Sequence, residues 1–308
     1  MSGGPLCMPY VDVSLNAEWS DWQNFPEGRP NPIYSYQVND YSLDGLVFGF
    51  ISLCEGNTAC WASLPQMPLD WALPLAHDIQ KFNKKVIVSF GGATYKDISS
   101  HFTVDDLVNT YNEVIRMYNA YGLDFNLENP LYNIDRICEA LVIVVASNPT
   151  IKISFTLQTL PQGLTSDGLA LVQKAKDKNL VVTVNGMAMD FYQGETVDMG
   201  AKSIQALDSI KSQLHTLYPD ESEAVCYSRT AITPMIGLND DSSMFIIPNA
   251  TSVGQYSFSK RAAFVCFWGL NRDNPSSFPH VDLSSSSNPE QKASGDYSKA
   301  FVQAIHKQ

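Results

Sequence analysis

The amino-acid sequence predicts an α/β fold, a (β/α)8 TIM barrel in which residues 1–308 form a single domain. Three observations favour this fold: short apolar runs recur along the chain, helical patterns lie between them, and the runs number eight. Near-continuous apolar runs are typical of parallel strands that are buried on both faces. Strands that alternate with helices indicate βαβ units, and eight such units fit a closed barrel better than an open sheet.

The predicted strands are spaced so that a helix fits after each one. They are residues 8–15, 45–53, 84–92, 121–128, 151–158, 180–190, 229–238 and 262–270. Helical patterns cover residues 68–84, 103–122 and 166–179, and a last helix at about 296–307 follows a polar loop. Thr103 can cap the second of these helices, and Gly122 suits its C-terminal stop.

The charge of the chain limits the partners that its surface can bind. The formal net charge is -12 at pH 7, which repels phosphate backbones and anionic lipids, so we expect neither nucleic acid nor a membrane as a partner. No apolar run is long enough to span a bilayer, and no signal peptide is visible in this chain. A neutral polysaccharide is compatible with such a surface.

Tryptophan side chains offer a way to bind such a polymer. Sugar rings expose apolar C–H faces that pack well on indole, so each tryptophan is either a sugar platform or a core residue. The five are Trp19, Trp22, Trp61, Trp71 and Trp268.

The cysteines and histidines indicate neither a disulfide scaffold nor a metal site. Cys54 and Cys60 bracket a short polar turn across which they can pair, whereas Cys138 and Cys266 lie in apolar runs typical of buried thiols. The five histidines are scattered without the spacing of metal ligands, so we expect no metal and no cofactor.

Polar residues inside the predicted strands mark the candidate site. Asp124, Asn126 and Glu128 alternate along the fourth strand, which places all three on one face, pointing into the barrel. Three polar groups in a buried strand are costly unless they bond to one another or serve a function. Asp190 ends the sixth strand and Trp268 lies near the end of the eighth, and the C-terminal ends of barrel strands are where active sites form.

Five strings of residues resemble the family-18 glycoside hydrolases, the chitinase family, in the order in which that family carries them. The strings are KKVIVSFGGA, YGLDFNLEN, VNGMAMD, ITPMIGLND and CFWGLNRD, and together they span almost the whole chain. The segment from Ser89 to Gly92 matches the S-x-G-G motif of the family's third strand, and DFNLE matches the end of its D-x-x-D-x-D-x-E motif.

The resemblance implies retaining hydrolysis of β-1,4 N-acetylglucosamine linkages in chitin, in which the substrate's own 2-acetamido group is the nucleophile. Glu128 matches the general acid, Asp124 and Asn126 stand in the catalytic motif, and Asp190 would help bind the sugar or its acetamido group. Trp268 would form the floor of the cleavage subsite. The other residues expected at the cleft are Tyr10, Met187, Tyr192 and Met235.

The sequence departs from the family motif at Asn126, where the family has Asp. An amide accepts a hydrogen bond but carries no charge, so we expect attenuated catalysis. The neutral neighbour also removes a like charge that would raise the pKa of Glu128. In addition, Tyr121 occupies the place of the motif's first Asp, and Met189 occupies the place of a Tyr in the family's M-x-Y-D string.

These departures leave three functions open. The first is a chitinase, the second a chitin- or glycan-binding lectin that has lost catalysis, and the third an endo-β-N-acetylglucosaminidase that acts on N-glycans. An engineered substitution at Asn126 is also open. We expect a monomer that binds chitin or N-acetylglucosamine oligosaccharides. Extracellular chitin requires a secreted enzyme, so the resemblance implies secretion.

Overall fold

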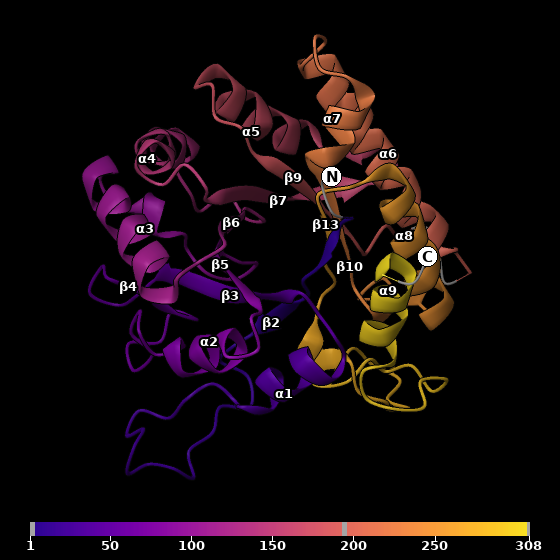
Figure 1. Ribbon diagram of the computed structural model, residues 1–308, viewed down its shortest axis with the longest axis horizontal. Coiled ribbons are helices and arrows are strands. Elements are labelled where there is room, and N and C mark those ends of the chain that lie inside the picture. The colour runs from indigo at the N-terminus through magenta and orange to yellow at the C-terminus, as the bar shows by residue number, and fades with distance from the viewer. Residues whose placement is uncertain (1–3, 193–195, 307–308) are drawn as a thin grey trace.

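A computed structural model describes residues 4–192 and 196–306, and its strands form a parallel barrel with helices around it (Figure 1). The sheet order is β1-β13-β10-β9-β7-β6-β5-β3-β2, with every neighbouring pair parallel. The strands are β1 (Leu6–Cys7), β2 (Tyr10–Asp12), β3 (Gly45–Leu53), β5 (Lys85–Gly91), β6 (Gly122–Asn126), β7 (Lys152–Leu160), β9 (Thr183–Ala188), β10 (Thr230–Pro234) and β13 (Phe264–Val265).

The barrel closes through its first strand, which is split into β1 and β2. The Met8 amide donates to the Val265 carbonyl at 3.0 Å, and the Val47 amide donates to the Pro9 carbonyl at 2.9 Å. The first strand therefore bonds the eighth on one side and the second on the other. The predicted (β/α)8 barrel and the positions of its eight strands are confirmed.

The helices lie around the barrel, and short hairpins extend several strands at their C-terminal ends (Figure 1). The helices are α1 (Ile33–Asp40), α2 (Leu73–Gln80), α3 (Val104–Tyr118), α4 (Ile134–Ser147), α5 (Ser166–Asp177), α6 (Met199–Leu217), α7 (Glu223–Ser228), α8 (Ile247–Lys260) and α9 (Asp296–His306). The hairpin strands are β4 (Ala59–Trp61), β8 (Gly163–Leu164), β11 (Gly237–Leu238) and β12 (Met244–Phe245). Position 307, the predicted end of the last helix, lies outside the described residues.

Helix α3 begins as its sequence predicts and ends at Tyr118, four residues before Gly122. The Thr103 hydroxyl accepts from the Asp106 amide at 3.2 Å and the Asp106 carboxylate accepts from the Thr103 amide at 3.1 Å, which forms a capping box. Asn119, with φ 42°, ends the helix in the left-handed conformation. The prediction for Gly122 was wrong: this residue opens β6, where it packs against the main chain of Lys152.

The cysteine predictions agree with the structure. Cys54 and Cys60 form a disulfide across the β3–β4 turn. Cys138 and Cys266 are free and buried, the first on α4 and the second just after β13. Both lie where an apolar run packs against its neighbours.

Among the described residues, no helix has the length and apolarity needed to cross a bilayer.

The end of β5 lies so close to the end of β6 that Gly91 tolerates no side chain. Gly91 has φ +99°, and a Cβ there would overlap the Asn126 carbonyl oxygen. We predict that Gly91→Ala lowers the free energy of unfolding by about 2–5 kcal/mol, from strain and overlap together. Gly56→Ala is the control, because Gly56 has φ +78° but open space around it, so only about 1 kcal/mol is expected. Urea unfolding measures both. Equal losses of unfolding free energy in the two variants would show that the close approach of β5 and β6 does not exclude a side chain at position 91.

Candidate active site

A buried carboxylate, Asp124 of β6, lies in the interior of the barrel and is bound by four hydroxyl groups. Its Oδ1 accepts from Ser154 Oγ at 2.6 Å and Thr156 Oγ1 at 2.7 Å. Its Oδ2 accepts from Ser89 Oγ at 2.6 Å and the Tyr10 hydroxyl at 2.9 Å. Burial raises the pKa of Asp124, and the four hydroxyls act against that rise. Both oxygens are thus occupied by protein donors.

The bonds around Asp124 continue across the barrel. Thr156 Oγ1 accepts from Asn185 Nδ2 at 2.9 Å, and Asn185 Oδ1 accepts from Thr233 Oγ1 at 2.9 Å. All of these residues are buried. Strands β5, β6, β7, β9 and β10 are therefore tied together by one polar layer under the candidate site.

Asn126 lies one step further along the same face of β6 and is far less satisfied. It is 5% exposed, its Nδ2 lies 3.9 Å from Met187 Sδ, and its Oδ1 has no protein partner. A buried acceptor without a donor costs about 1–3 kcal/mol. The free Oδ1 is therefore ready to accept a hydrogen bond from a ligand.

Glu128 follows the end of β6 and is half-buried. Its main chain is fixed by neighbours: Gln158 Nε2 donates to the Glu128 carbonyl at 3.2 Å, and Asn129 Nδ2 lies 2.9 Å from the Gly92 carbonyl. Burial raises the pKa of Glu128, the Asn126 amide opposes this, and the charge of Asp190 raises the pKa further. The like charge that Asn126 does not supply is therefore contributed by Asp190.

Asp190 is held at the mouth of the barrel by the loop that follows β11. Its Oδ1 accepts from the Asp240 amide at 2.7 Å and the Asp241 amide at 3.3 Å, and its own amide donates to Asn239 Oδ1 at 3.3 Å. Burial raises the pKa of Asp190, and the charge of Asp240 adds to the effect. The loop after β11 thus fixes both the carboxylate and the main-chain amide of Asp190.

An aromatic wall stands at the ends of the first, second and eighth strands. The half-buried Trp268 stacks on Phe50 with ring centroids 5.8 Å apart and planes at 20°, and lies 6.1 Å from the Tyr10 ring. The predicted position of Trp268 at the mouth agrees with this arrangement. Phe50 was not predicted, because it lies within an apolar run that gives no sign of where the strand meets the site.

The other residues expected at the cleft lie at different depths. Tyr10 is 2% exposed and bonded to Asp124, so it lies beneath the aromatic wall. Met187 and Met235 are buried, and the main chain of Met235 forms an isolated parallel β-bridge with that of Trp268. Tyr192 is 80% exposed, and residues 193–195 after it lie outside the described residues. The binding roles of these four residues stay predictions.

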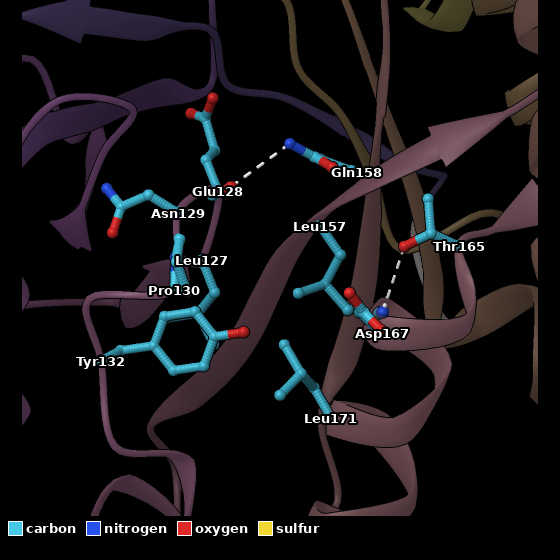
Figure 2. A pocket seen from close by; sticks show the side chains of 11 residues that line it. Leu127, Glu128, Asn129, Pro130, Tyr132, Leu157, Gln158, Thr165, Asp167 and Leu171 are labelled. Atoms are coloured by element: carbon cyan, nitrogen blue, oxygen red, sulfur yellow. Dashed lines mark hydrogen bonds between the residues drawn. The ribbon is translucent and has the colours of Figure 1, made fainter.

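A cavity of about 210 Å³ lies beside Glu128, between the loops that follow β6 and β7 (Figure 2). Tyr132, Asp167 and Leu171 line it from one side. Figure 2 shows the Glu128 carboxyl pointing away from these side chains. The carboxyl therefore does not line this cavity with its oxygens, and Asn126 and Asp190 are the side chains that influence its pKa.

Over residues 4–192 and 196–306, no group of three or more His, Cys, Asp or Glu side chains is placed to hold a metal ion.

Comparison with curated proteins finds chitinases. The chain is 26% identical over 287 residues to endochitinase 11 of Metarhizium anisopliae, covering 87% of this chain and 52% of that protein. It is 25% identical over 289 residues to a probable bifunctional chitinase/lysozyme of Escherichia coli, covering 87% and 31%. The chain thus spans about half or less of the length of these relatives. No family model matches it.

Comparison with solved structures finds the same class of protein. The catalytic domain of a hyperthermophilic chitinase from Pyrococcus furiosus superposes with a TM-score of 0.86 at 26% identity, covering 99% of both chains. Catalytic-site mutants of active domain 2 of that chitinase, complexed with chito-oligosaccharides, also give 0.86 at 26% identity, over 98% of this chain and 96% of that one. The Group IV chitinase of Ostrinia furnacalis shares the fold, with a TM-score of 0.60 at 11% identity.

The parallel barrel places carboxylates and the half-buried Trp268 at the C-terminal ends of its strands, which is where TIM-barrel enzymes carry their active sites. Together with the order of its motifs, the similarity to these chitinases supports the assignment of the chain as a family-18 chitinase catalytic domain.

The surroundings of Glu128 predict its titration. Its pKa is raised from the ordinary value of 4.5, so the carboxyl should keep its proton to a higher pH than a free glutamate. We predict that Asp190→Asn lowers the pKa of Glu128, because it removes a like charge. Asp167→Asn, across the cavity, should leave it unchanged. Titration of the Glu128 carboxyl by ¹³C NMR measures this, and an equal effect of both variants would contradict the proximity of Asp190.

Proposed function

We propose that this domain hydrolyses β-1,4 linkages between N-acetylglucosamine units in chitin or chito-oligosaccharides. The observation that carries the proposal is the juxtaposition of Glu128, whose pKa is raised, with the unpartnered Oδ1 of Asn126 at the mouth of the barrel. The first is suited to protonate a leaving oxygen and the second to accept an amide N–H. The chitinase relatives, and the Pyrococcus structure that holds chito-oligosaccharides, support this substrate class.

In the proposed reaction the substrate supplies its own nucleophile. Glu128 donates its proton to the glycosidic oxygen while the 2-acetamido carbonyl oxygen closes onto the anomeric carbon and displaces the leaving sugar. The resulting oxazolinium ion is opened by a water molecule, from which the Glu128 carboxylate takes a proton. Two displacements at the anomeric carbon retain its configuration. Only sugars with a 2-acetamido group can react in this way.

Asn126 sets the rate of this reaction. Its Oδ1 would accept the acetamido N–H and orient the carbonyl, but the neutral amide offers no charge against the developing positive ring. Removal of one preorganised group from an active site costs about 10²–10³ in rate. Asp124 cannot replace the missing charge at the acetamido group, because four hydroxyls hold both of its oxygens.

The other side chains at the mouth bind and position the sugar in this proposal. The Trp268 indole forms the floor beneath the cleaved unit, with Phe50 stacked against it. Asp190 binds the sugar or its acetamido group and raises the pKa of Glu128. Tyr10, Met187, Met235 and Tyr192 complete the cleft. The reaction requires no metal or cofactor, since acid and nucleophile come from Glu128 and the substrate.

A second candidate is a chitin-binding protein with little turnover. The neutral Asn126 favours it, because binding through a hydrogen bond survives the loss of charge and catalysis does not. An endo-β-N-acetylglucosaminidase would use the same acetamido chemistry on N-glycans. Product analysis by mass, on a chitin oligomer and an N-glycopeptide in parallel, distinguishes all three.

We further propose that residues 1–308 act as one catalytic domain, monomeric and secreted, without nucleic acid or a membrane as a partner. The Cys54–Cys60 disulfide supports secretion, because disulfides persist in oxidising compartments outside the cytosol. The net charge of -12 supports the absence of polyanionic partners.

Glu128→Gln tests the acid directly. The amide keeps the shape of the side chain but has no acidic proton to give, so hydrolysis of a chitin oligomer should fall at least about 100-fold while the oligomer still binds. Turnover is followed by mass spectrometry and binding by calorimetry. Glu139→Gln, on the outer surface of α4, is the control and should match the unaltered protein. Hydrolysis that survives in Glu128→Gln would exclude this residue as the acid.

Asn126→Asp tests the attenuation. If the missing charge limits the rate, kcat on soluble chitin oligomers should rise by about 10²–10³. Asn126→Ala should lower it instead, since the hydrogen-bond acceptor is then lost as well. An unchanged or lower rate in Asn126→Asp would mean that the site is adapted to the amide and that charge at this position is not limiting.

A further inference from the structure

Two exposed tryptophans lie on one loop, here called the tryptophan loop, residues 18–29 between β2 and α1. Trp19 is 50% exposed and Trp22 is 63% exposed, whereas Trp61 and Trp71 are buried at 0% and 5%. Exposed indoles that pack against nothing on their outer side leave a large apolar area in water. The tryptophans of the chain thus divide into core residues, the Trp268 of the cleft, and this pair.

The tryptophan loop is clamped at its base. Glu18 and Arg29 exchange two backbone hydrogen bonds of 2.8 and 3.0 Å. The Arg29 guanidinium forms a 2.7 Å ion pair with Asp78 of α2, and the Trp71 indole N–H donates to the Glu27 carbonyl at 2.9 Å. A buried tryptophan therefore holds the loop that presents the exposed ones.

The loop is also ordered within its own length. The Phe25 amide donates to the Asp21 carbonyl at 2.9 Å, and the Gly28 amide donates to the Phe25 carbonyl at 2.9 Å. The Trp19 ring lies against Gly28, where a Cβ would come within 2.9 Å of the indole carbons. The two indoles are therefore presented on a preorganised support, which reduces the entropy lost on binding.

The position of the loop relates it to the candidate site. It follows β2, so it starts from the end of the barrel at which Glu128 and Trp268 lie, and in Figure 1 it projects outward beside α1 and α2. The main-chain amide of Asp12, the last residue of β2, donates a hydrogen bond of 2.8 Å to Asn271 Oδ1, which lies after β13. The tryptophan loop thus projects from the side of the barrel, next to the helices that follow the first two strands.

We propose that Trp19 and Trp22 dock the domain on the surface of an insoluble N-acetylglucosamine polymer, at sugar rings outside the cleft. This inference rests on the proposed function. Apolar faces of pyranose rings are the partners that indoles fit, and the acidic side chains Glu18, Asp21 and Glu27 on the same loop disfavour an anionic partner. The neutral polymer that the site would cleave satisfies both conditions.

The test uses the double variant Trp19→Ala/Trp22→Ala in adsorption to insoluble chitin and in hydrolysis of a soluble chitin hexamer. Loss of two stacking contacts should lower the adsorption partition coefficient, and with it the rate on insoluble chitin, by about tenfold or more. The rate on the soluble hexamer should stay within about twofold. Phe82→Ala is the control, because Phe82 is an aromatic residue, 42% exposed, before the start of β5 at the other end of the barrel.

The outcomes test the docking role of the two tryptophans and the proposed function separately. Unchanged adsorption of the double variant overturns the inference, as does an equal loss on the soluble hexamer. Wild-type protein that cleaves the hexamer but does not adsorb leaves the proposed function standing and overturns the docking role. If the wild-type protein adsorbs but does not hydrolyse the hexamer, and the double variant no longer adsorbs, the docking role is supported and the proposed function is contradicted. Trp22→Ala alone, with the Trp19 contact to Gly28 intact, repeats the test should the double variant unfold.

Discussion

A carboxylate buried inside a barrel needs hydrogen-bond donors, and four hydroxyls supply them to Asp124. These come from Tyr10 on β2, Ser89 on β5 and two residues of β7, so the charge bonds across the strands on both sides of β6. A shift of any of these strands by one residue would turn its hydroxyl out of the barrel. Asp124 therefore fixes the register of the strands that carry the site.

Strand β6 and the residues directly after it present three polar groups in three different environments. Asp124 is saturated by protein donors, Asn126 is buried with a free acceptor, and Glu128 is half-buried at the rim with a raised pKa. In the proposed mechanism, Asp124 has a structural role, Asn126 binds the ligand and Glu128 performs the acid–base chemistry. The aromatic wall, in which Trp268 stacks on Phe50, also lies at the mouth of the barrel.

Much of the fold was predictable from the sequence, because strands buried on both faces have few polar residues and appear as continuous apolar runs. The positions of Glu128, Asp190 and Trp268 near strand ends were also predictable, and their roles stay predictions. The hydroxyl partners of Asp124 were not, because Ser154 and Thr156 are ordinary strand residues until the register places them next to a carboxylate. The depth of Tyr10 depends on the same register.

Other features depend on tertiary contacts that leave no local signal. Asn129 fixes the Glu128 main chain by reaching the carbonyl groups of the loop after β5. Asn239 Oδ1, in the loop after β11, accepts a hydrogen bond from the main-chain amide of Asp190, in the loop after β9. The end of α3 at Asn119 rather than Gly122 follows from the close packing of β6 on β7, which reserves the glycine for the strand.

In the proposed reaction, the substrate's acetamido group performs the first displacement at a site prepared by Asn126 and Glu128. The anomeric form of the first product reports on this step, and ¹H NMR observes it during hydrolysis of a chitin oligomer, before mutarotation. Two displacements predict the β-anomer. Initial release of the α-anomer, or cleavage of oligomers that lack N-acetyl groups at an equal rate, would contradict the account.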